Sequence, residues 1–296
     1  MKSNRPLTTM LFIPGTAQDK FANIPRIRSR AFILDLEDAV PPGEKSASRE
    51  RVARVLTEQG EHASLHVRVN PIDSGYIVDD LEAIVRPGLS GIDLPKVSRP
   101  SDIETVDSLI SAYESRIGLP VGEIELMATI ETVAGVRSVY DIAAVSGRLR
   151  RLCFGAGDFT LDVGLDWPDG DGDSSATLLF AKVQLVLASR AAGLEAPHDS
   201  VYPRFADLTG LRREADESRA LGFVGKHAIH PDQLKIIEEV YRPTVQQIER
   251  AKRLVAAFAD AEETGHGAVG VDGELVDYPI LYRARQVLAD AEAAEA

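Results

Sequence analysis

The sequence predicts an α/β fold, namely a TIM (β/α)8 barrel with a C-terminal helical extension or lid. Short runs rich in β-branched and aromatic residues recur eight times, and polar segments with helical spacing separate them. The chain has 296 residues, of which 44% are apolar and 27% charged. This composition is that of a globular protein long enough to bury a complete barrel core.

The eight predicted strands follow one another at intervals that leave room for a helix after most of them. They are Met10 to Ile13, Ala31 to Leu36, Leu65 to Val69, Gly91 to Leu94, Ile124 to Ile130, Leu152 to Phe154, Ala196 to Val201 and Phe223 to Ile229. The seventh run has little strand character of its own and is predicted from its place in the repeat. Polar or glycine residues follow most strands, at the rim where a barrel carries its active site.

The barrel is predicted to occupy residues 1–240, and a helical extension and lid residues 241–296. An apolar stripe behind Pro243 predicts a helix from Thr244 to Glu263. A glycine-rich hinge, Gly265 to Gly273, is expected next, and a last helix is expected to begin at Asp277-Tyr278-Pro279. The pattern alone fits a mobile lid and an oligomer contact equally well.

Net charge and cysteine content limit the partners and the compartment. The net charge is −13 and no Lys/Arg-rich run occurs, which argues against nucleic acid and anionic membranes as partners. The single cysteine, Cys153, excludes a disulfide within the chain and is expected to be a small core residue rather than a nucleophile. With no signal-peptide pattern and no long apolar span, we expect a cytoplasmic protein.

An acidic loop after the sixth strand superficially suggests calcium binding. Asp169, Asp171 and Asp173 stand at alternate positions, but an EF-hand needs a glutamate at the twelfth position, which is Phe180 here. We therefore expect a flexible acidic lid or a cap on the rim.

Two carboxylates make the rim a candidate metal site. Glu131 directly follows the fifth strand, and Asp158 follows the sixth after Gly155-Ala156-Gly157. Magnesium prefers oxygen ligands and is often held by only one or two carboxylates, so substrate oxygens can complete its shell. Asp35, Glu37 and Asp38 are expected to accept hydrogen bonds from metal-bound water.

Other rim residues suggest how an anionic substrate is held. Arg68 follows the third strand and is expected either to neutralise the acids or to bind a carboxylate or enolate through its planar guanidinium. The backbone N–H groups of Ala156 and Gly157 suit a small anion. His227 and His230 lack a third ligand spaced for zinc and are interpreted as loop or ligand-contact residues.

The order of several motifs resembles a known family. The motifs are MLFIPG, FILDLEDAVPPGEK, VRVN, DLPKV, ATIETVAGV, FGAGDF, GKHAIHPDQL and ELVDYPILYRARQVL. Together they resemble the HpcH/HpaI aldolase and citrate lyase β-subunit superfamily, in its CitE-like branch with malyl-CoA and citramalyl-CoA lyases. The resemblance implies a TIM barrel with a C-terminal extension, assembly as trimers or hexamers, and Mg²⁺-dependent cleavage or formation of C–C bonds in 3-hydroxyacyl thioesters.

The resemblance also implies roles for single residues. Glu131 and Asp158 match metal ligands, Arg68 matches the arginine that holds the substrate oxygens, Glu37 and Asp38 match acids that bind metal waters, and Asp277 matches the lid acid that reaches a neighbouring subunit's site. Relatives often carry an arginine where this chain has Thr8-Thr9 before Met10, and that arginine is associated with the thioester carrier. Lys20 is the candidate here for a contact with a CoA phosphate.

Three functions remain open at this point. The first is a lyase that cleaves a substrate such as malyl-CoA or citramalyl-CoA to a 2-oxo acid and an acyl-CoA, with Asp277 protonating the enolate carbon. The second is the β subunit of a citrate lyase, which acts on citryl bound to an acyl-carrier protein. The third is a non-catalytic barrel that serves as a scaffold or regulatory binder.

Overall fold

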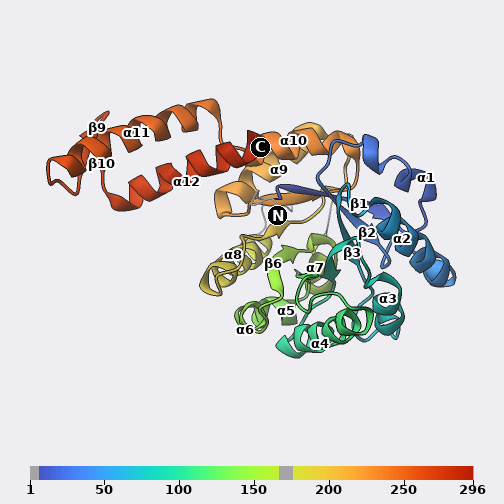
Figure 1. Cartoon of the computed structure of the whole chain (residues 1–296). Coiled ribbons are helices and arrows are strands. Elements are labelled where there is room, and N and C mark those ends of the chain that lie inside the picture. Colours follow the sequence, from blue (N-terminus) through green and yellow to red (C-terminus); the bar gives the residue numbers. More distant parts are fainter. Residues whose placement is uncertain (1–6, 167–175, 296) are drawn as a thin grey trace. The chain divides into compact units, whose positions relative to one another are not determined.

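The computed structural model of the chain describes residues 7–166 and 176–295. Eight parallel strands close into a barrel in the order β1 to β8, with β8 paired back to β1 (Figure 1). The strands are β1 Thr9–Pro14, β2 Ala31–Asp35, β3 Ser64–Arg68, β4 Leu89–Leu94, β5 Glu125–Ile130, β6 Leu149–Phe154, β7 His198–Asp199 and β8 Gly225–Ala228. The predicted TIM barrel is confirmed, and all eight predicted strands are present.

The largest differences from the predicted strand boundaries are those of β6 and β7. β6 begins at Leu149, three residues earlier than expected, and β7 is only His198–Asp199 instead of Ala196 to Val201. Pro197 has no N–H group to donate to a neighbouring strand, which explains why the ladder begins only after it. Ser200, the next residue after β7, instead uses its hydroxyl to accept the Ala156 N–H at 3.0 Å.

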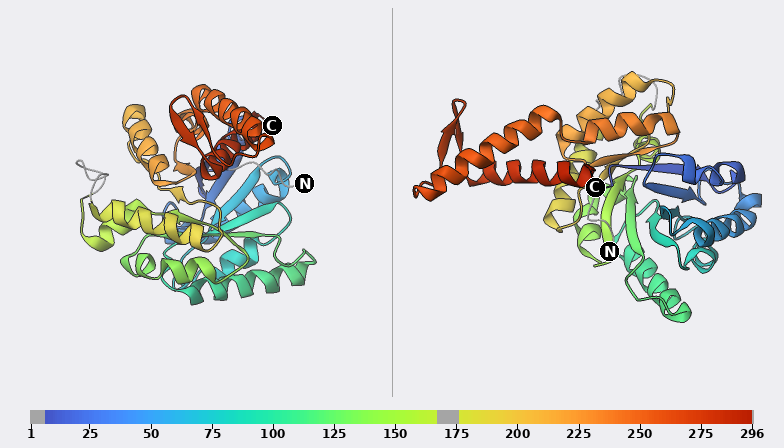
Figure 2. Two further views of the ribbon diagram at one scale, coloured as in Figure 1. Left: turned by 90° about the vertical axis from the view of Figure 1, so that its left-hand side faces the viewer. Right: turned by 45° about the horizontal axis from the view of Figure 1, so that its top comes forward.

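Helices follow the strands and surround the barrel (Figure 2). They are α1 Gln18–Phe21, α2 Lys45–Gln59, α3 Ile77–Ile84, α4 Pro100–Ile117, α5 Val133–Arg137, α6 Val139–Ala144, α7 Ala156–Val163, α8 Ala176–Ala191, α9 Leu208–Leu221 and α10 Pro231–Tyr241. Among the described residues, no helix combines the length and apolar composition that crossing a bilayer requires. The acidic-loop residues Asp169, Asp171 and Asp173 lie outside the described residues.

Alternation along the strands positions the site above an apolar layer. Ala31 and Ile33 of β2 belong to one buried cluster with Met10, Met127 and Cys153. Because side chains alternate along a strand, the next residue on the same side of β2 is Asp35, which is placed at the carboxyl-end rim. Cys153 is free and fully buried, as expected for a core residue.

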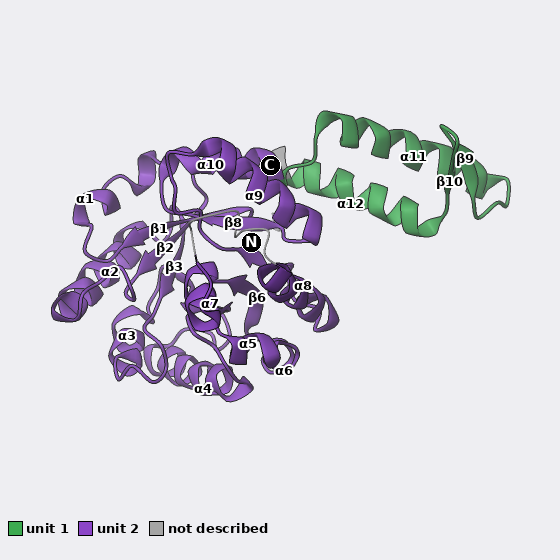
Figure 3. Ribbon diagram, turned by 180° about the vertical axis from the view of Figure 1, so that it is seen from behind, with its two compact units in different colours: residues 1–6, 241–296 green, residues 7–240 purple. Residues whose placement is uncertain are grey.

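The chain divides into two compact units, one formed by Leu7–Val240 and one containing Tyr241–Ala296 (Figure 3). The second unit comprises α11 Val245–Glu263, the strands β9 Val269–Val271 and β10 Glu274–Val276, and α12 Tyr278–Glu295. Its helices pack side by side around a core of their own, which includes Leu254, Phe258 and Leu281 (Figure 1).

The second unit both confirms and corrects the sequence-based predictions. The first helix begins after Thr244, whose hydroxyl accepts the Gln247 N–H at 3.2 Å while the Gln247 side chain accepts the Thr244 N–H at 2.9 Å. The predicted glycine hinge is wrong, since residues 265–273 contain β9 and the turn that leads into its antiparallel partner β10. Asp272 and Gly273 connect these strands with φ of 51° and 83°, the signature of a two-residue hairpin turn.

Candidate active site

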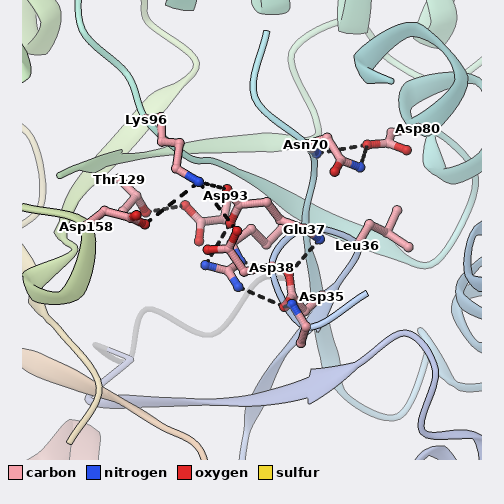
Figure 4. Close-up of polar contacts among 12 residues, drawn as sticks. Asp35, Leu36, Glu37, Asp38, Asn70, Asp80, Asp93, Lys96, Thr129 and Asp158 are labelled. Carbon is pink, nitrogen blue, oxygen red and sulfur yellow. Dashed lines mark hydrogen bonds and ion pairs between the residues drawn. The ribbon is translucent and has the colours of Figure 1, made fainter. Parts of the chain in front are cut away.

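Polar side chains from five neighbouring strand ends converge on the barrel rim (Figure 4). They are Glu37 and Asp38 after β2, Arg68 at the end of β3, Lys96 after β4, Glu131 after β5 and Asp158 in the first turn of α7, after β6. Parallel strands place their carboxyl ends together, so residues as far apart in the sequence as Glu37 and Asp158 meet here. Of the residues predicted for the site, the barrel therefore brings five together: Glu37, Asp38, Arg68, Glu131 and Asp158.

Arg68 is fixed by two carboxylates and an aromatic ring. Its Nε and Nη2 donate to the two carboxylate oxygens of Asp35, each at 2.8 Å, and its Nη1 lies 3.0 Å from Glu37 Oε2. The guanidinium also lies over the Phe12 ring at 4.9 Å. Burial opposes the charge, but Asp35 outweighs it and holds the pKa of Arg68 above its usual value. Burial likewise tends to raise the pKa of Asp35, yet Arg68 brings that pKa below its usual value.

Glu131 lies directly against Gly155. A Cβ at Gly155 would stand 2.1 Å from Glu131 Oε2 and 2.6 Å from Glu131 Cβ, so only glycine leaves room for this carboxylate. The other oxygen, Oε1, accepts the Lys96 N–H at 2.8 Å. Burial raises the pKa of Glu131 well above its usual range, and the nearby carboxylates of Glu37 and Asp158 raise it further.

Glu37 is buried between two cations. Its Oε1 accepts from Lys96 Nζ at 2.6 Å, and Arg68 lies on its other oxygen. Burial raises the pKa of Glu37 to about 7, although Arg68 and Lys96 act in the opposite direction. Asp38 is more exposed and lies 3.5 Å from Lys96 Nζ.

The turn that carries Glu37 is held from below by a buried lysine. Lys45 Nζ donates to the carbonyl oxygens of Leu36 and Glu37 at 2.6 and 2.8 Å, and to Asn70 Oδ1 at 2.6 Å. The Asn70 amide in turn donates to Asp80 Oδ2 at 2.6 Å (Figure 4). These bonds tie the turns after β2 and β3 together.

Asp93 adds a buried acid beneath the rim. Its Oδ1 accepts the Thr129 hydroxyl at 2.7 Å. Burial raises the pKa of Asp93 to about 6, while Thr129 and Arg68 act to lower it.

The remaining predicted residues lie elsewhere or are already engaged. The Ala156 N–H donates to Ser200, and Gly157 follows it in α7. Lys20 is exposed on α1. Asp277 belongs to the second unit, where its Oδ1 accepts the Ile280 N–H at 3.3 Å at the start of α12.

Of the two interpretations of the histidines, the loop interpretation is wrong for His227. His227 is not a loop residue but a buried member of β8, and its ring packs against Phe12 and His198. Because side chains alternate along a strand, His227 faces the same side of β8 as Gly225. His230 does lie in the loop, where it stacks on Phe205.

Lys96, the lysine of the DLPKV motif, lies in the site although no role was predicted for it from the sequence. Lys45 and Asp93 were missed because one lies in a helix and the other within a strand. Lys96 could have been found from its position, since it directly follows Pro95 after β4, where Glu131 follows β5.

The donor set suits magnesium. Glu131 and Asp158 supply carboxylate oxygens, and the missing Cβ of Gly155 forms a cradle for one of them. Within the described ranges no group of three or more His, Cys, Asp or Glu side chains is arranged to enclose a metal ion. Magnesium is often held by one or two protein carboxylates, and water and substrate oxygens complete its shell.

Residues 8–231 match the family model described as HpcH/HpaI aldolase/citrate lyase. The chain belongs to this family. It is 34% identical over 295 residues to the citrate lyase subunit beta of Leuconostoc mesenteroides, covering 99% of this chain and 96% of that protein. It is 36% identical over 289 residues to a (3S)-malyl-CoA thioesterase of Cereibacter sphaeroides, covering 97% and 95%.

The fold agrees with this HpcH/HpaI family membership. The Mycobacterium tuberculosis protein CitE, solved in complex with magnesium, acetoacetate and coenzyme A, superposes with a TM-score of 0.80 at 26% identity, covering 96% of this chain and 98% of that one. The chain is thus an enzyme of a lyase family with a barrel fold.

Proposed function

We propose that this protein is a Mg²⁺-dependent carbon–carbon lyase that cleaves or forms a 3-hydroxyacyl-CoA thioester such as malyl-CoA or citramalyl-CoA. The products of cleavage are a 2-oxo acid and an acyl-CoA. The observation that carries the proposal is the convergence of Glu131, Asp158 and the doubly anchored Arg68 on one rim. The complex of the M. tuberculosis relative with magnesium, acetoacetate and coenzyme A supports the choice of substrate class.

Glu131 and Asp158 would hold the magnesium ion. When bound, the ion supplies Lewis-acid polarisation of the oxygen that becomes the carbonyl of the oxo acid. Gly155 gives the Glu131 carboxylate its place, and the Lys96 N–H fixes one of its oxygens. The protein therefore orients the first of these ligands before any cation binds.

Arg68 supplies fixed positive charge to the reacting oxygens. In cleavage the 3-hydroxyl group loses its proton to water and becomes the carbonyl of the 2-oxo acid. The electron pair of the broken C–C bond moves into a thioester enolate, whose oxygen gains negative charge and whose carbon is protonated afterwards. The guanidinium cannot rotate freely, because Asp35 holds two of its nitrogens and Phe12 covers its face. A donor fixed in this way stabilises developing charge without reorganising during the reaction.

Asp277 is proposed as the acid that protonates the enolate carbon, or as the base that removes this proton in the condensing direction. We propose that it acts in a neighbouring subunit of a homotrimer or hexamer, as the family resemblance implies. Mixed oligomers of Asp277→Asn and Arg68→Met chains test this, because some of their sites combine an intact Arg68 with an intact Asp277. Recovery of activity on mixing supports the arrangement, and no recovery from oligomers shown to exchange subunits contradicts it.

The thioester carrier is expected to lie over the rim near Lys20, with Ala156 and Gly157 lining the substrate. Thr8-Thr9 stand where relatives often have an arginine, so Lys20 is the proposed phosphate contact. We propose a cytoplasmic location for the enzyme, where CoA thioesters are available.

A second candidate is the β subunit of a citrate lyase that acts on citryl bound to an acyl-carrier protein. The 34% identity to the L. mesenteroides subunit over nearly the whole chain favours this candidate. The same residues would perform the cleavage, and only the carrier differs. For either candidate, we propose that residues 1–240 form the catalytic barrel and that residues 241–296 form the helical extension and lid.

The test is a substrate panel with two product assays. Purified protein with Mg²⁺ is incubated with malyl-CoA, methylmalyl-CoA, citramalyl-CoA, citryl-CoA and citryl-acyl-carrier protein, and released 2-oxo acid and free CoA are both measured. Release of oxo acid without free CoA supports the lyase, whereas free CoA without oxo acid indicates a thioesterase. Preference for the carrier-protein substrate selects the second candidate.

The metal ligands are tested with Glu131→Gln and Asp158→Asn, which each remove a negative charge at nearly constant size. Each is expected to abolish the Mg²⁺-dependent activity. Undiminished turnover in the presence of a chelator contradicts the metal-dependent mechanism.

A further inference from the structure

Lys96 contacts four rim carboxylates from an uncommon backbone conformation. Its φ is 55°, and among the described residues only Asp272 shares a positive φ outside glycine. The left-handed region is disfavoured for a residue with a Cβ, so surrounding contacts must hold it there. These contacts are the N–H bond to Glu131 Oε1 at 2.8 Å and the Nζ bond to Glu37 Oε1 at 2.6 Å.

The ammonium lies where cationic charge is most needed. Nζ is also 3.8 Å from Asp158 Oδ2 and 3.5 Å from Asp38 Oδ1 (Figure 4). Arg68 is bound to Asp35, and Lys96 is the cation that pairs with Asp158 within residues 7–166 and 176–295. Without it, the carboxylates of Glu37, Glu131 and Asp158 would repel one another at a largely buried site.

The Lys96 side chain can move out of the site more easily than the other cationic side chains there. Its side chain is 33% exposed, against 16% for Arg68, and Lys45 is buried on backbone carbonyls. A lysine stem has several rotatable bonds, so the ammonium can move into water while the backbone N–H remains on Glu131.

We propose that Lys96 is an internal counter-ion that competes with the divalent cation for the rim carboxylates. In the metal-free protein its ammonium neutralises Glu37 and Asp158, and it leaves them when magnesium binds, while its N–H continues to position Glu131. The inference rests on the proposed magnesium site and adds a positioning residue that also weakens metal binding. It explains why a lysine points into a site whose ligands suit a cation.

The experiment compares wild type, Lys96→Gln and Lys96→Arg as full chains in metal-depleted buffer. Mg²⁺ affinity is measured by calorimetry, and thermal unfolding is followed with and without Mg²⁺. Removal of a unit charge a few ångströms from a divalent ion is expected to tighten Kd for Mg²⁺ about tenfold or more in Lys96→Gln. Lys96→Gln should also melt at a lower temperature than wild type without Mg²⁺ and show the larger upward shift when it is added. Lys96→Arg keeps the charge and should stay within about threefold of wild type.

A purely structural or metal-assisting role predicts the opposite sign. If Lys96→Gln binds Mg²⁺ no more tightly than wild type, the competition is wrong. A measurement on wild type does not depend on the variant folding: reductive methylation of Lys96, quantified by mass spectrometry, should increase when Mg²⁺ is added, because the released ammonium becomes accessible. Unchanged or reduced methylation also overturns the inference.

The two proposals can fail separately. If wild type binds no Mg²⁺, the proposed metal-dependent function and the competition both fail, and Lys96 belongs to a permanent ion-pair network. If wild type binds Mg²⁺ and Lys96→Gln does not bind it more tightly, only the competition fails.

Discussion

Replacing Gly155 by alanine tests whether the Glu131 carboxylate is positioned by the absence of a side chain. The added Cβ would stand 2.1 Å from Glu131 Oε2 and 2.6 Å from Glu131 Cβ, below the 3.0 Å that such contacts require. Glu131 must therefore move by the better part of an ångström. A buried side chain can do this only by straining its neighbours, which costs about 1–3 kcal/mol of unfolding free energy.

The same displacement should disturb metal binding. Glu131 Oε1 accepts the Lys96 N–H at 2.8 Å, and this bond cannot survive such a shift unchanged. Magnesium requires near-octahedral geometry at short range, and loss of a supporting contact around a ligand typically weakens metal affinity by about 10–100-fold. We expect a loss of this size in Gly155→Ala.

The assays are denaturant unfolding in chelator and calorimetric titration with Mg²⁺. Gly147→Ala is the matched control, because a Cβ at Gly147 meets nothing within 4 Å, and it should leave both quantities nearly unchanged. A Gly155→Ala protein with unfolding free energy within about 0.5 kcal/mol of wild type and unaltered Mg²⁺ affinity would refute the reasoning.

Three further predictions concern stability. Asp93 has a folded pKa of about 6 against 3.8 unfolded, so the unfolding free energy of wild type should fall by about 3 kcal/mol as pH rises through this window. Urea unfolding at pH 4 and pH 8 should show this fall in wild type and not in Asp93→Asn, and an equal change in both proteins would contradict the prediction. Burial, with Arg151 adding to it, lowers the pKa of His227 from 6.5 to about 3, so the unfolded state takes up the proton first and about 2 kcal/mol is lost between pH 6.5 and 5. His227→Asn should reduce that acid sensitivity by this amount, and an unchanged difference between the two pH values argues against the cause. Thr244→Ala removes the cap of α11 and should cost about 1 kcal/mol in thermal unfolding, whereas Thr244→Ser should cost much less.

The fold was predictable because its signals are local and repeated. Each strand, such as Ala31–Asp35, is a short apolar run, and the repeat with intervening helices leaves few alternatives to a closed barrel. The predictions failed where local signals conflict. Pro197 shortened β7, and the glycines of residues 265–273 serve a hairpin whose Asp272-Gly273 turn is itself a recognisable pattern.

The candidate site was predictable only in part. A carboxylate directly after a strand, such as Glu131, must reach the rim, and the strand pattern is enough to infer this. Asp93 was not predictable in the same way, because an acid within a strand has the same spacing whether it lies in a polar layer or is an exposed surface residue. Its burial beside Arg68, its partner across the β3–β4 pair, depends on how these strands pair, which the local pattern does not reveal.

Lys96 shows why the residues of such a site are easier to predict from the sequence than the cation that balances their charge. The sequence places several acids at one rim and suggests a cation to neutralise them, and that inference holds for any cation. In the folded chain a lysine from the fourth strand end already supplies part of that charge, through a backbone conformation that no residue preference would predict. A metal ion at this rim must therefore be weighed against a cation built into the protein, and the affinity of the site is set by the difference between the two.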